Sequence, residues 1–546
     1  MFFSRATASH ILPRRHPYLT NLLTDTALEM HCALYNQDLL FNIAMYLHML
    51  SAARNPDLLA FVLTCRSFCK PGLDVLWMHI HDPFPLMRLA PGYMDVEDDY
   101  MPDESWATFL SYSKRIRFLS SIVHNYDDTF YRSLRTVPGN LLPGIRHLVW
   151  YPESLLGLQR IYFAISHFLH TLELWIPAKD GMVIGAVENS NVLLTRLSQL
   201  CPNLENLHFD NAPFFLISPH DVECASQALC SFHRLRILDM KTSYKTYPIT
   251  LESLRFLANL QTLEHLAVYV DDDFLPPWGP HLFILPSPFP SLVEISLTWD
   301  NTETSELIGS IIASISSPLI KVVNLFPRYD IAPSDLEAVL EAVGGHQSVG
   351  RVGISHVHFK HDSEEIDYDI DIPDRTIFPL FRLRHIFSFE LEGFMLEYED
   401  LLVYRMTQAW RNLITVIVSE LDHHGQLRPA VDILDLQCFA KSTPYIREIK
   451  LPFISRLRGQ GQLPSAQLRP GGQVNPITLH HGWTISPNAL LAASFLYIVF
   501  GSLNLVGIDS GGRDDLDKAL RCILQNRDLD GRVMWHRLPY RRWDTL

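Results

Sequence analysis

The chain has 546 residues, of which 47% are apolar and 19% are charged, and its formal charge at pH 7 is −15. This composition excludes a largely disordered chain, and the length requires several domains or one elongated repeat array. The acidic balance argues against a general binder of nucleic acid or of anionic membranes, because a phosphate surface needs a basic footprint.

The first 30 residues form no predicted element. Residues 1–24 contain Arg5, Arg14 and Arg15 and no acidic residue. This pattern weakly resembles a mitochondrial presequence, but a disordered leader over 1–30 is the preferred interpretation.

Residues 31–80 predict a small helical module. Apolar residues at helical spacing fall in 36–47, 56–65 and 67–77. A bundle of this size buries little apolar surface and usually docks on something else. The module therefore points to an interaction role.

The module resembles a known family. ALYNQDLLFNIAMYL (33–47) and DLLAFVLTCRSFCKPGLDVLW (57–77) resemble an F-box, with Leu-Leu near the start, Thr-Cys-Arg in the middle and a closing Leu-Trp. The closest likeness is to fungal F-box proteins that carry irregular leucine-rich repeats. ESWATFLSYSKRIRFL (104–119) resembles the linker helix that follows the box in that family.

The resemblance implies that the module binds the Skp adaptor of a cullin–RING ubiquitin ligase, while the repeats hold a protein substrate. The adaptor face it implies consists of Leu34, Leu39, Leu40, Ile43, Leu47, Leu58, Leu59, Cys65, Arg66, Leu76 and Trp77. Gln37 stands where the family usually has proline. This departure keeps open a second interpretation, in which the module only caps the first repeat of a non-catalytic interaction scaffold.

A linker over 81–140 follows, with one acidic stretch and the linker helix. The acidic stretches at 95–104 and 362–371 are interpreted as solvated loops, and a docking site for a basic partner is the alternative.

The rest of the chain, 141–546, repeats the pattern L-x-x-L-x-φ, where φ is a large apolar residue. The copies recur about every 30 residues, close to the period of leucine-rich repeats. Their first apolar positions are Ile145, Leu169, Leu204, Leu235, Leu263, Leu292, Leu413, Ile446 and Leu503, with similar windows at Leu319, Val349 and Leu383.

Leucines at helical spacing precede several of these strands, as at 191–200, 251–260 and 333–343, the last with Ser334 as the expected cap. Stacked units would point the repeated leucines inward as one core. The predicted fold class is therefore α/β: a three-helix F-box module followed by an irregular leucine-rich-repeat solenoid, or horseshoe.

The residues between the inward leucines form the outward row that is the candidate substrate face. They are Glu173, His208, Asp239, Ala267, Ser296 and Lys450. The row shows no charge bias and no aromatic cluster, so the sequence does not identify the substrate.

The last part of the chain contains a Gly-, Gln- and Pro-rich stretch, which predicts a loop over about 455–482. Residues 489–508 are apolar enough to span a membrane, but polar interruptions and the missing Lys/Arg flank favour a buried helix followed by a strand at 503–508.

Side chains with catalytic or metal-binding chemistry form no recognised pattern. His356, His358 and His361 lack a carboxylate or cysteine at a closing spacing, and no second pair joins Cys65 and Cys69 in a zinc site. The eight cysteines suggest no disulfide scaffold, and no nucleophile or phosphate-loop motif is present. We expect no enzyme activity, metal or cofactor, and a location in the cytoplasm or nucleus.

Overall fold

The computed structural model describes residues 36–50, 56–81, 83–89, 106–123, 140–152, 155–176, 193–211, 219–240, 249–271, 286–328, 331–356, 370–397, 401–419, 431–432, 435–451, 453–454, 477–481 and 503–507. Two compact units divide the chain. Unit 1 comprises Met1–Ser120 and Asp128–Ile145, and unit 2 comprises Ser121–Asp127 and Arg146–Leu546.

Unit 1 begins with three helices, α1 (Gln37–Leu50), α2 (Pro56–Thr64) and α3 (Arg66–Leu76). The side chain of Asn36 accepts hydrogen bonds from the amides of the second and third residues of α1, so this helix begins at Gln37 without a proline. Cys65 has extended backbone and separates α2 from α3. The three predicted helical segments are therefore present.

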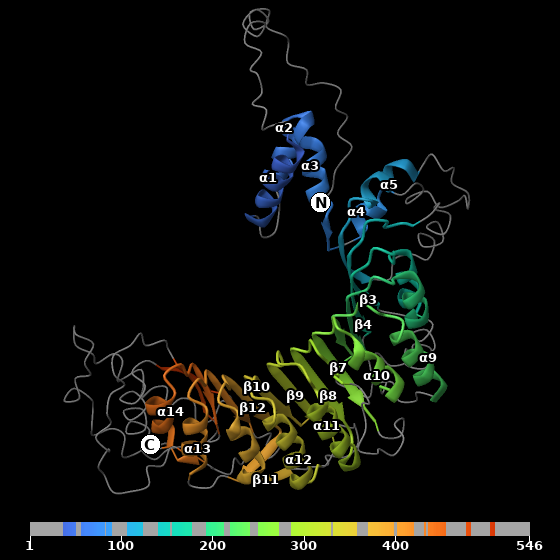
Figure 1. The fold of residues 1–546 in the computed structure, drawn as a ribbon. Coiled ribbons are helices and arrows are strands. Elements are labelled where there is room, and N and C mark those ends of the chain that lie inside the picture. The colour runs from blue at the N-terminus through green and yellow to red at the C-terminus, as the bar shows by residue number, and fades with distance from the viewer. Residues whose placement is uncertain are drawn as a thin grey trace, which may run out of the picture. The chain divides into compact units, whose positions relative to one another are not determined.

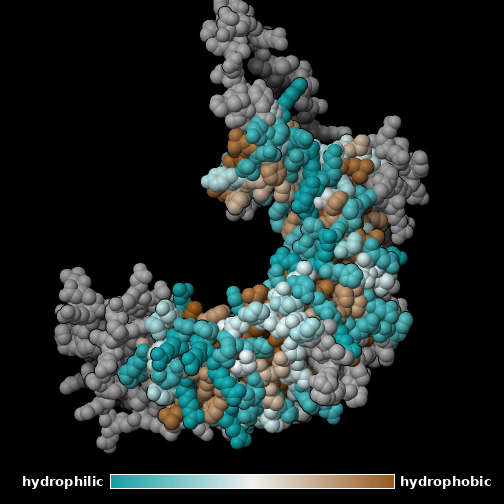
Figure 2. Space-filling view, in the orientation of Figure 1, coloured by the Kyte–Doolittle hydropathy of each residue, from teal (hydrophilic) through white to brown (hydrophobic). Residues whose placement is uncertain are grey.

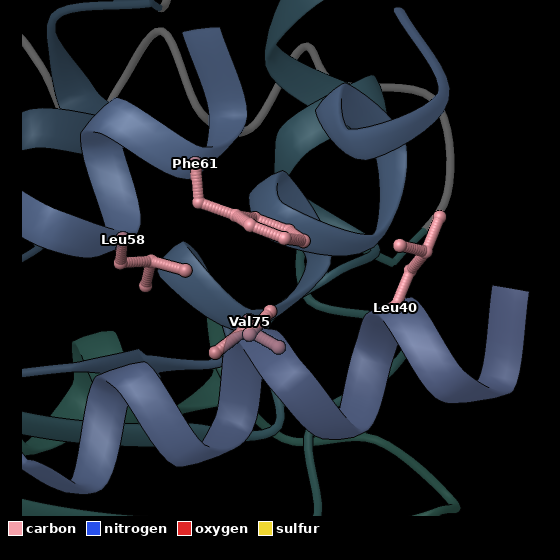
Figure 3. Packing of buried hydrophobic residues seen from close by; sticks show 5 residues of the cluster. Leu40, Leu58, Phe61 and Val75 are labelled. Atoms are coloured by element: carbon pink, nitrogen blue, oxygen red, sulfur yellow. The ribbon is translucent and has the colours of Figure 1, made fainter. Parts of the chain in front are cut away.

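These helices enclose a small apolar core (Figure 3). Its buried members are Leu40, Ala44, Leu58, Phe61 and Val75. A side chain at Gly72 would collide with Val62, so glycine lets α3 approach α2 closely. The core is small, as the sequence suggested, because much of the apolar surface of α1 and α2 points elsewhere.

In the remainder of unit 1, the linker helix is shorter than predicted. After β1 (His79–Ile80) and α4 (Phe84–Met87), helix α5 (Ala107–Ser113) covers only the middle of the predicted linker helix. The chain then becomes strand β2 (Phe118–Val123), which pairs in parallel with β1. The predicted helix over 104–119 is therefore wrong at its end, where Phe118 pairs with the backbone of β1.

Unit 2 is built on a parallel sheet in which each strand lies beside the next repeat's strand (Figure 1). The order is β3-β4-β5-β6-β7-β8-β9-β10-β12-β14-β16-β18-β19. The strands are β3 (His147–Pro152), β4 (Thr171–Ile176), β5 (Asn206–Asn211), β6 (Ile237–Asp239), β7 (His265–Val270), β8 (Glu294–Trp299), β9 (Val322–Pro327), β10 (Arg351–Ser355), β12 (Ser388–Glu392), β14 (Thr415–Ser419), β16 (Glu448–Lys450), β18 (Ile477–His481) and β19 (Leu503–Gly507).

Helices connect the strands along one side of this sheet (Figure 1). They are α7 (Leu155–Gln159), η3 (Arg160–Phe163), α9 (Pro219–Leu229), α10 (Leu251–Asn259), α11 (Thr302–Ser314), α12 (Pro333–Gly344), η5 (Asp374–Arg382), α13 (Leu402–Ala409) and α14 (Leu436–Ser442). Small parallel pairs join β11 (Ile370–Pro373) to β13 (Phe394–Glu397) and β15 (Val431–Asp432) to β17 (Phe453–Ile454). The predicted α/β solenoid of strand and returning helix is present in unit 2.

Local sequence explains several helix starts. Thr250 caps α10 by accepting from the amide of Ser253, and Asn301 caps α11 by accepting from the amide of Thr304 at 2.8 Å. The predicted cap Ser334 is wrong: α12 begins at Pro333, so Ser334 is the second residue of the helix. Proline suits this position because its missing N–H has no intrahelical partner there.

The repeated leucines form the core of unit 2. Leu169, Leu204, Leu235, Leu263 and Leu292 are completely buried, as predicted. The window at Leu319 is wrong by one residue.

Leu319 is 51% exposed and Ile320 is buried. Because side chains alternate along a strand, a shift of one residue exchanges the buried and exposed sets.

The end of the chain differs from the prediction in one respect. Strand β18 (Ile477–His481) lies inside the predicted loop and pairs with β16 and β19. It occupies the place of a repeat in the long gap between Ile446 and Leu503. The predicted helix in 489–508 lies outside the described residues, and β19 confirms the strand that follows it. None of the described helices is long and apolar enough to cross a membrane.

Candidate functional site

The first three helices of unit 1 expose large apolar side chains. On α1 these recur three or four residues apart, which places them along one side of the helix, and α2 adds two more, four residues apart. We define the apolar helical face as Leu39, Ile43, Tyr46, Met49, Leu50, Leu59 and Leu63. Exposure reaches 75% at Leu63 and 78% at Met49. Brown atoms gather over this helical part in Figure 2.

The apolar helical face exists because α1 is apolar on two sides. Leu40 and Ala44 point into the core, and Ile43 and Tyr46 point away from it. A surface helix normally has one apolar stripe and an opposite polar side. A second stripe, open to water, is a candidate docking surface.

The residues that the F-box resemblance implies for adaptor binding separate into three groups. Leu39, Ile43, Leu59 and Arg66 are exposed. Cys65, Leu47, Leu76 and Trp77 are half-buried, and Leu47 and Leu76 pack against the core. Leu40 and Leu58 are corrected to core positions, because both are completely buried. Leu34 lies outside the described residues.

Tyr46, Met49, Leu50 and Leu63 also belong to this face, although the sequence resemblance does not single them out. Their spacing from Leu39 and Leu59 was the available signal. It could not be used without the structure, since any apolar residue on a short helix is also a candidate for the core.

The second surface is the side of the sheet opposite to the inward leucines. Along each strand, alternate side chains point to opposite sides. The predicted outward residues Glu173, His208, Asp239, Ala267 and Ser296 are successive register partners in β4 to β8. Lys450 continues the same row in β16, paired with Ile417. The predicted row is therefore a real row of the sheet; contact of its members with a substrate stays a prediction.

Two members of the row are corrected to buried positions. Ser296 is 4% exposed and its hydroxyl accepts a hydrogen bond from Asn324 Nδ2 at 3.0 Å. Ala267 is 9% exposed, because its methyl group does not reach beyond longer neighbours. Short side chains in the row lie below the polar side chains around them.

Three histidine–carboxylate pairs cross this face between neighbouring strands. His147 Nε2 lies 2.9 Å from Glu173 Oε1, His208 Nδ1 lies 3.5 Å from Asp239 Oδ2, and His265 Nδ1 lies 3.2 Å from Glu294 Oε2. The hydrogen bond with Asp239 raises the pKa of His208; burial opposes the rise, and the negative charges of Asp239 and Glu173 add to it. All six side chains are between 28% and 41% exposed.

An aromatic pair lies at the start of the same face. The rings of Tyr151 in β3 and Trp175 in β4 stack at 5.8 Å with an interplanar angle of 20°. Trp175 is 39% exposed. Burial, and then the charge of Glu173, raises the pKa of Tyr151. No aromatic cluster was predicted here, because the two rings meet only through strand register.

Farther along the sheet the charges alternate in sign. Arg351 Nη2 lies 3.1 Å from Glu390 Oε2, and Lys450 Nζ lies 3.9 Å from Glu392 Oε1. None of the strands β3 to β8 contains a lysine or an arginine. The strand face therefore carries carboxylates and histidines over β3–β8, and carboxylates together with Arg351 and Lys450 over β10–β16.

Groups suited to covalent or metal chemistry are not gathered in the described part of the chain. No set of three or more His, Cys, Asp or Glu side chains there could hold a metal ion. His356 is buried against the ring of Phe394, and His358 and His361 lie outside the described residues. Burial raises the pKa of the Cys201 thiol to about 12, which leaves it protonated at neutral pH.

The chain shows only weak similarity to known proteins. No family model matches the chain, and no curated protein matches it. A solved structure of the yeast Rad7–Elc1 complex matches with 13% identity over 73% of this chain and 92% of that chain, at a TM-score of 0.37. The leucine-rich-repeat-containing protein LegL7 from Legionella pneumophila matches with 12% identity over 74% of this chain and 96% of that chain, at a TM-score of 0.28. TM-scores this low assign neither a fold nor a function.

Proposed function

We propose that the chain is the substrate receptor of a cullin–RING ubiquitin ligase. In this proposal the apolar helical face docks a Skp-type adaptor, and the strand face of unit 2 binds the protein to be ubiquitinated. The observation that carries the proposal is the exposed apolar surface on α1 and α2, within the stretch of sequence that resembles an F-box. The resemblance supplies the identity of the partner, and the exposed surface supplies a physical reason for docking.

The energetics favour docking over exposure to water. Fully burying one exposed leucine, isoleucine or methionine side chain contributes about 1.5–3 kcal/mol. The apolar helical face holds several such side chains, with Met49 and Leu63 more than two-thirds exposed. Helices with apolar anchors at these spacings bind into apolar grooves. A partner with such a groove would remove this surface from water.

The proposed mechanism is proximity rather than chemistry by this chain. A receptor holds a lysine of the substrate near the transferring enzyme and thereby raises its effective concentration. We propose that no residue of this chain forms a covalent intermediate.

Gln37 favours one alternative, a repeat scaffold that does not take part in ubiquitination. It replaces the proline that the family usually has before its acidic-Leu-Leu sequence. Gln37 is the first residue of α1, a position where proline is favoured but not required. The capping by Asn36 shows how α1 begins without it. The scaffold alternative therefore depends on the adaptor failing to bind.

The test is binding of purified Skp-type adaptor to the full-length chain by isothermal titration calorimetry. We expect saturable binding by the wild type. Leu59→Glu combined with Leu63→Glu should weaken it at least a hundredfold, because two charges would enter an apolar contact. Leu319→Glu is the matched control, since Leu319 is a similarly exposed leucine of unit 2. Absence of binding by folded wild-type protein would leave the scaffold alternative.

A further inference from the structure

We infer that the strand face over β3–β8 binds a basic segment of the partner protein, whose Lys or Arg side chains meet the carboxylates of Glu173, Asp239 and Glu294 and the aromatic pair of Tyr151 and Trp175. The inference deepens the proposed function, on which it rests, by naming the class of substrate for the same face.

The strands of this part of the face carry three carboxylates, each paired with a histidine of a neighbouring strand. The side chains of Glu173, Asp239 and Glu294 are 28%, 41% and 35% exposed, and the strands that carry the face contain no lysine or arginine. Arg236 directly precedes β6, but both oxygens of Glu264 accept from its Nη2 at 2.8 and 2.9 Å, so its charge is already matched. A basic ligand is therefore complementary to β3–β8, and an acidic ligand or a nucleic acid is repelled.

The aromatic pair adds a second feature that a cation would recognise. Glu173 and Trp175 are two residues apart in β4, so both side chains lie on the same side of the strand. Tyr151 stacks on Trp175 from the neighbouring strand and holds the exposed indole in place. A guanidinium or ammonium group over this ring would gain a cation–π contact beside a carboxylate.

The two features also define how a basic segment would lie. Trp175 and Glu173 are near the first strands of the face, Asp239 is in β6 and Glu294 is in β8. In β7 and β8 the row that contains Glu173 and Asp239 is continued by Ala267 and Ser296, whose buried side chains offer no contact to a ligand. An extended segment crossing the strands would therefore place cationic side chains at Glu173 and Asp239 before these two residues, and at Glu294 in the adjacent row beside Ser296.

The experiment measures peptide binding to the full-length chain by fluorescence anisotropy at pH 8.0, where histidine as a residue type carries less positive charge than at lower pH. The probe is a fluorescein-labelled peptide of about 12 residues with arginine at alternate positions, separated by glycine and serine. The same peptide with glutamate in place of arginine is the negative probe. We expect saturable binding of the arginine peptide that weakens with added salt, and none of the glutamate peptide.

Matched variants locate the binding. Glu173→Gln combined with Asp239→Asn should raise the Kd about fivefold, and Trp175→Ala about tenfold. Glu306→Gln on α11 and Tyr445→Ala remove an exposed carboxylate and an exposed aromatic ring elsewhere in unit 2, and both should leave the Kd within about twofold. If Trp175→Ala does not fold, the test uses Glu173→Gln together with Trp175→Phe, which keeps an aromatic ring.

The inference is overturned if the folded wild type does not bind the arginine peptide, or if the control variants weaken binding as much as the strand-face variants do. It is separable from the proposed function, because adaptor binding is measured at α1 and α2. Adaptor binding without peptide binding contradicts the inference alone. Peptide binding without adaptor binding contradicts the receptor proposal alone.

Discussion

Leu39 and Leu40 follow one another in α1, yet Leu39 is 39% exposed and Leu40 is completely buried. Successive residues of a helix point about 100° apart, so one leucine contacts the core and its neighbour remains open to water. The pair of leucines that marks an F-box in sequence thus performs two tasks in this module. Leu40 holds the helices together, and Leu39 belongs to the surface proposed to bind the adaptor.

This division predicts different effects for the same substitution at the two leucines. Leu40→Ala leaves a cavity among Ala44, Leu58 and Val75 and should lower the stability of the helical module by about 2–5 kcal/mol. Leu39→Ala should change stability by less than about 0.5 kcal/mol while weakening adaptor binding. Hydrogen exchange of peptides from α1–α3, read by mass spectrometry, separates the two. Equal protection in both variants would contradict the assignment of core and surface.

The pair of His208 and Asp239 predicts a dependence of stability on pH. The pKa of His208 is raised above 6.5 in the folded chain, so the contribution of the pair is fully present below the unfolded value and is lost as the pH rises through the folded value. The advantage of the wild type over His208→Gln should therefore be larger at pH 5.5 than at pH 8.5. Both side chains are partly exposed, so the difference should remain below about 1 kcal/mol.

Thermal unfolding of the two proteins at these two pH values measures that advantage, with Asp239→Asn as the partner variant. Asp239→Asn should lose most of the pH-dependent part that His208→Gln loses, because the charge of Glu173, which also raises the pKa of His208, remains. A constant difference between wild type and His208→Gln across this range would show that the pair does not form in solution.

Two glycines in neighbouring helices of unit 2 predict changes in the free energy of unfolding of opposite sign for the same substitution to alanine. A Cβ at Gly309 in α11 would lie 3.8 Å from the nearest atom, the carbonyl oxygen of Ala338. Gly309→Ala should therefore stabilise the chain by about 0.5–1 kcal/mol, because alanine restricts the unfolded chain and favours a helix.

At Gly344, the last residue of α12, a Cβ would lie 2.7 Å from the carbonyl oxygen of Pro379. Gly344→Ala should destabilise by about 1–3 kcal/mol, because backbone of η5 must move. Urea unfolding of both variants measures the two changes. Stabilisation of Gly344→Ala would mean that α12 does not pack against η5 as the structure shows.

The sequence predicted the solenoid well where a regular pattern recurs. Leu204 and Leu207 repeat the spacing of Leu235 and Leu238, and all four are buried, with Leu207 in β5 paired to Leu238 in β6. The pattern was less reliable where two apolar residues are adjacent. A window started at Leu319 places the polar Asn324 in its third apolar slot, whereas a start at Ile320 reaches Val323 and Leu325, which are both buried.

The candidate sites were harder to predict, because they depend on which residues of different elements come together. Tyr151 and Trp175 stack through the register of β3 and β4, and neither belongs to a motif. The acidic bias was likewise hidden: the predicted row contains both Glu173 and Lys450, but Lys450 lies in a much later strand, 3.9 Å from Glu392. Neighbouring strands, rather than composition, determine the charge that a ligand meets.

The central claim is that α1 and α2 form the adaptor-binding surface of a ligase receptor. Hydrogen exchange of the full-length chain, measured with and without saturating purified Skp-type adaptor, tests this most directly. We expect increased protection in peptides covering 37–50 and 56–64, with no change in the helices of unit 2. Unchanged exchange throughout, or protection confined to unit 2, would contradict it.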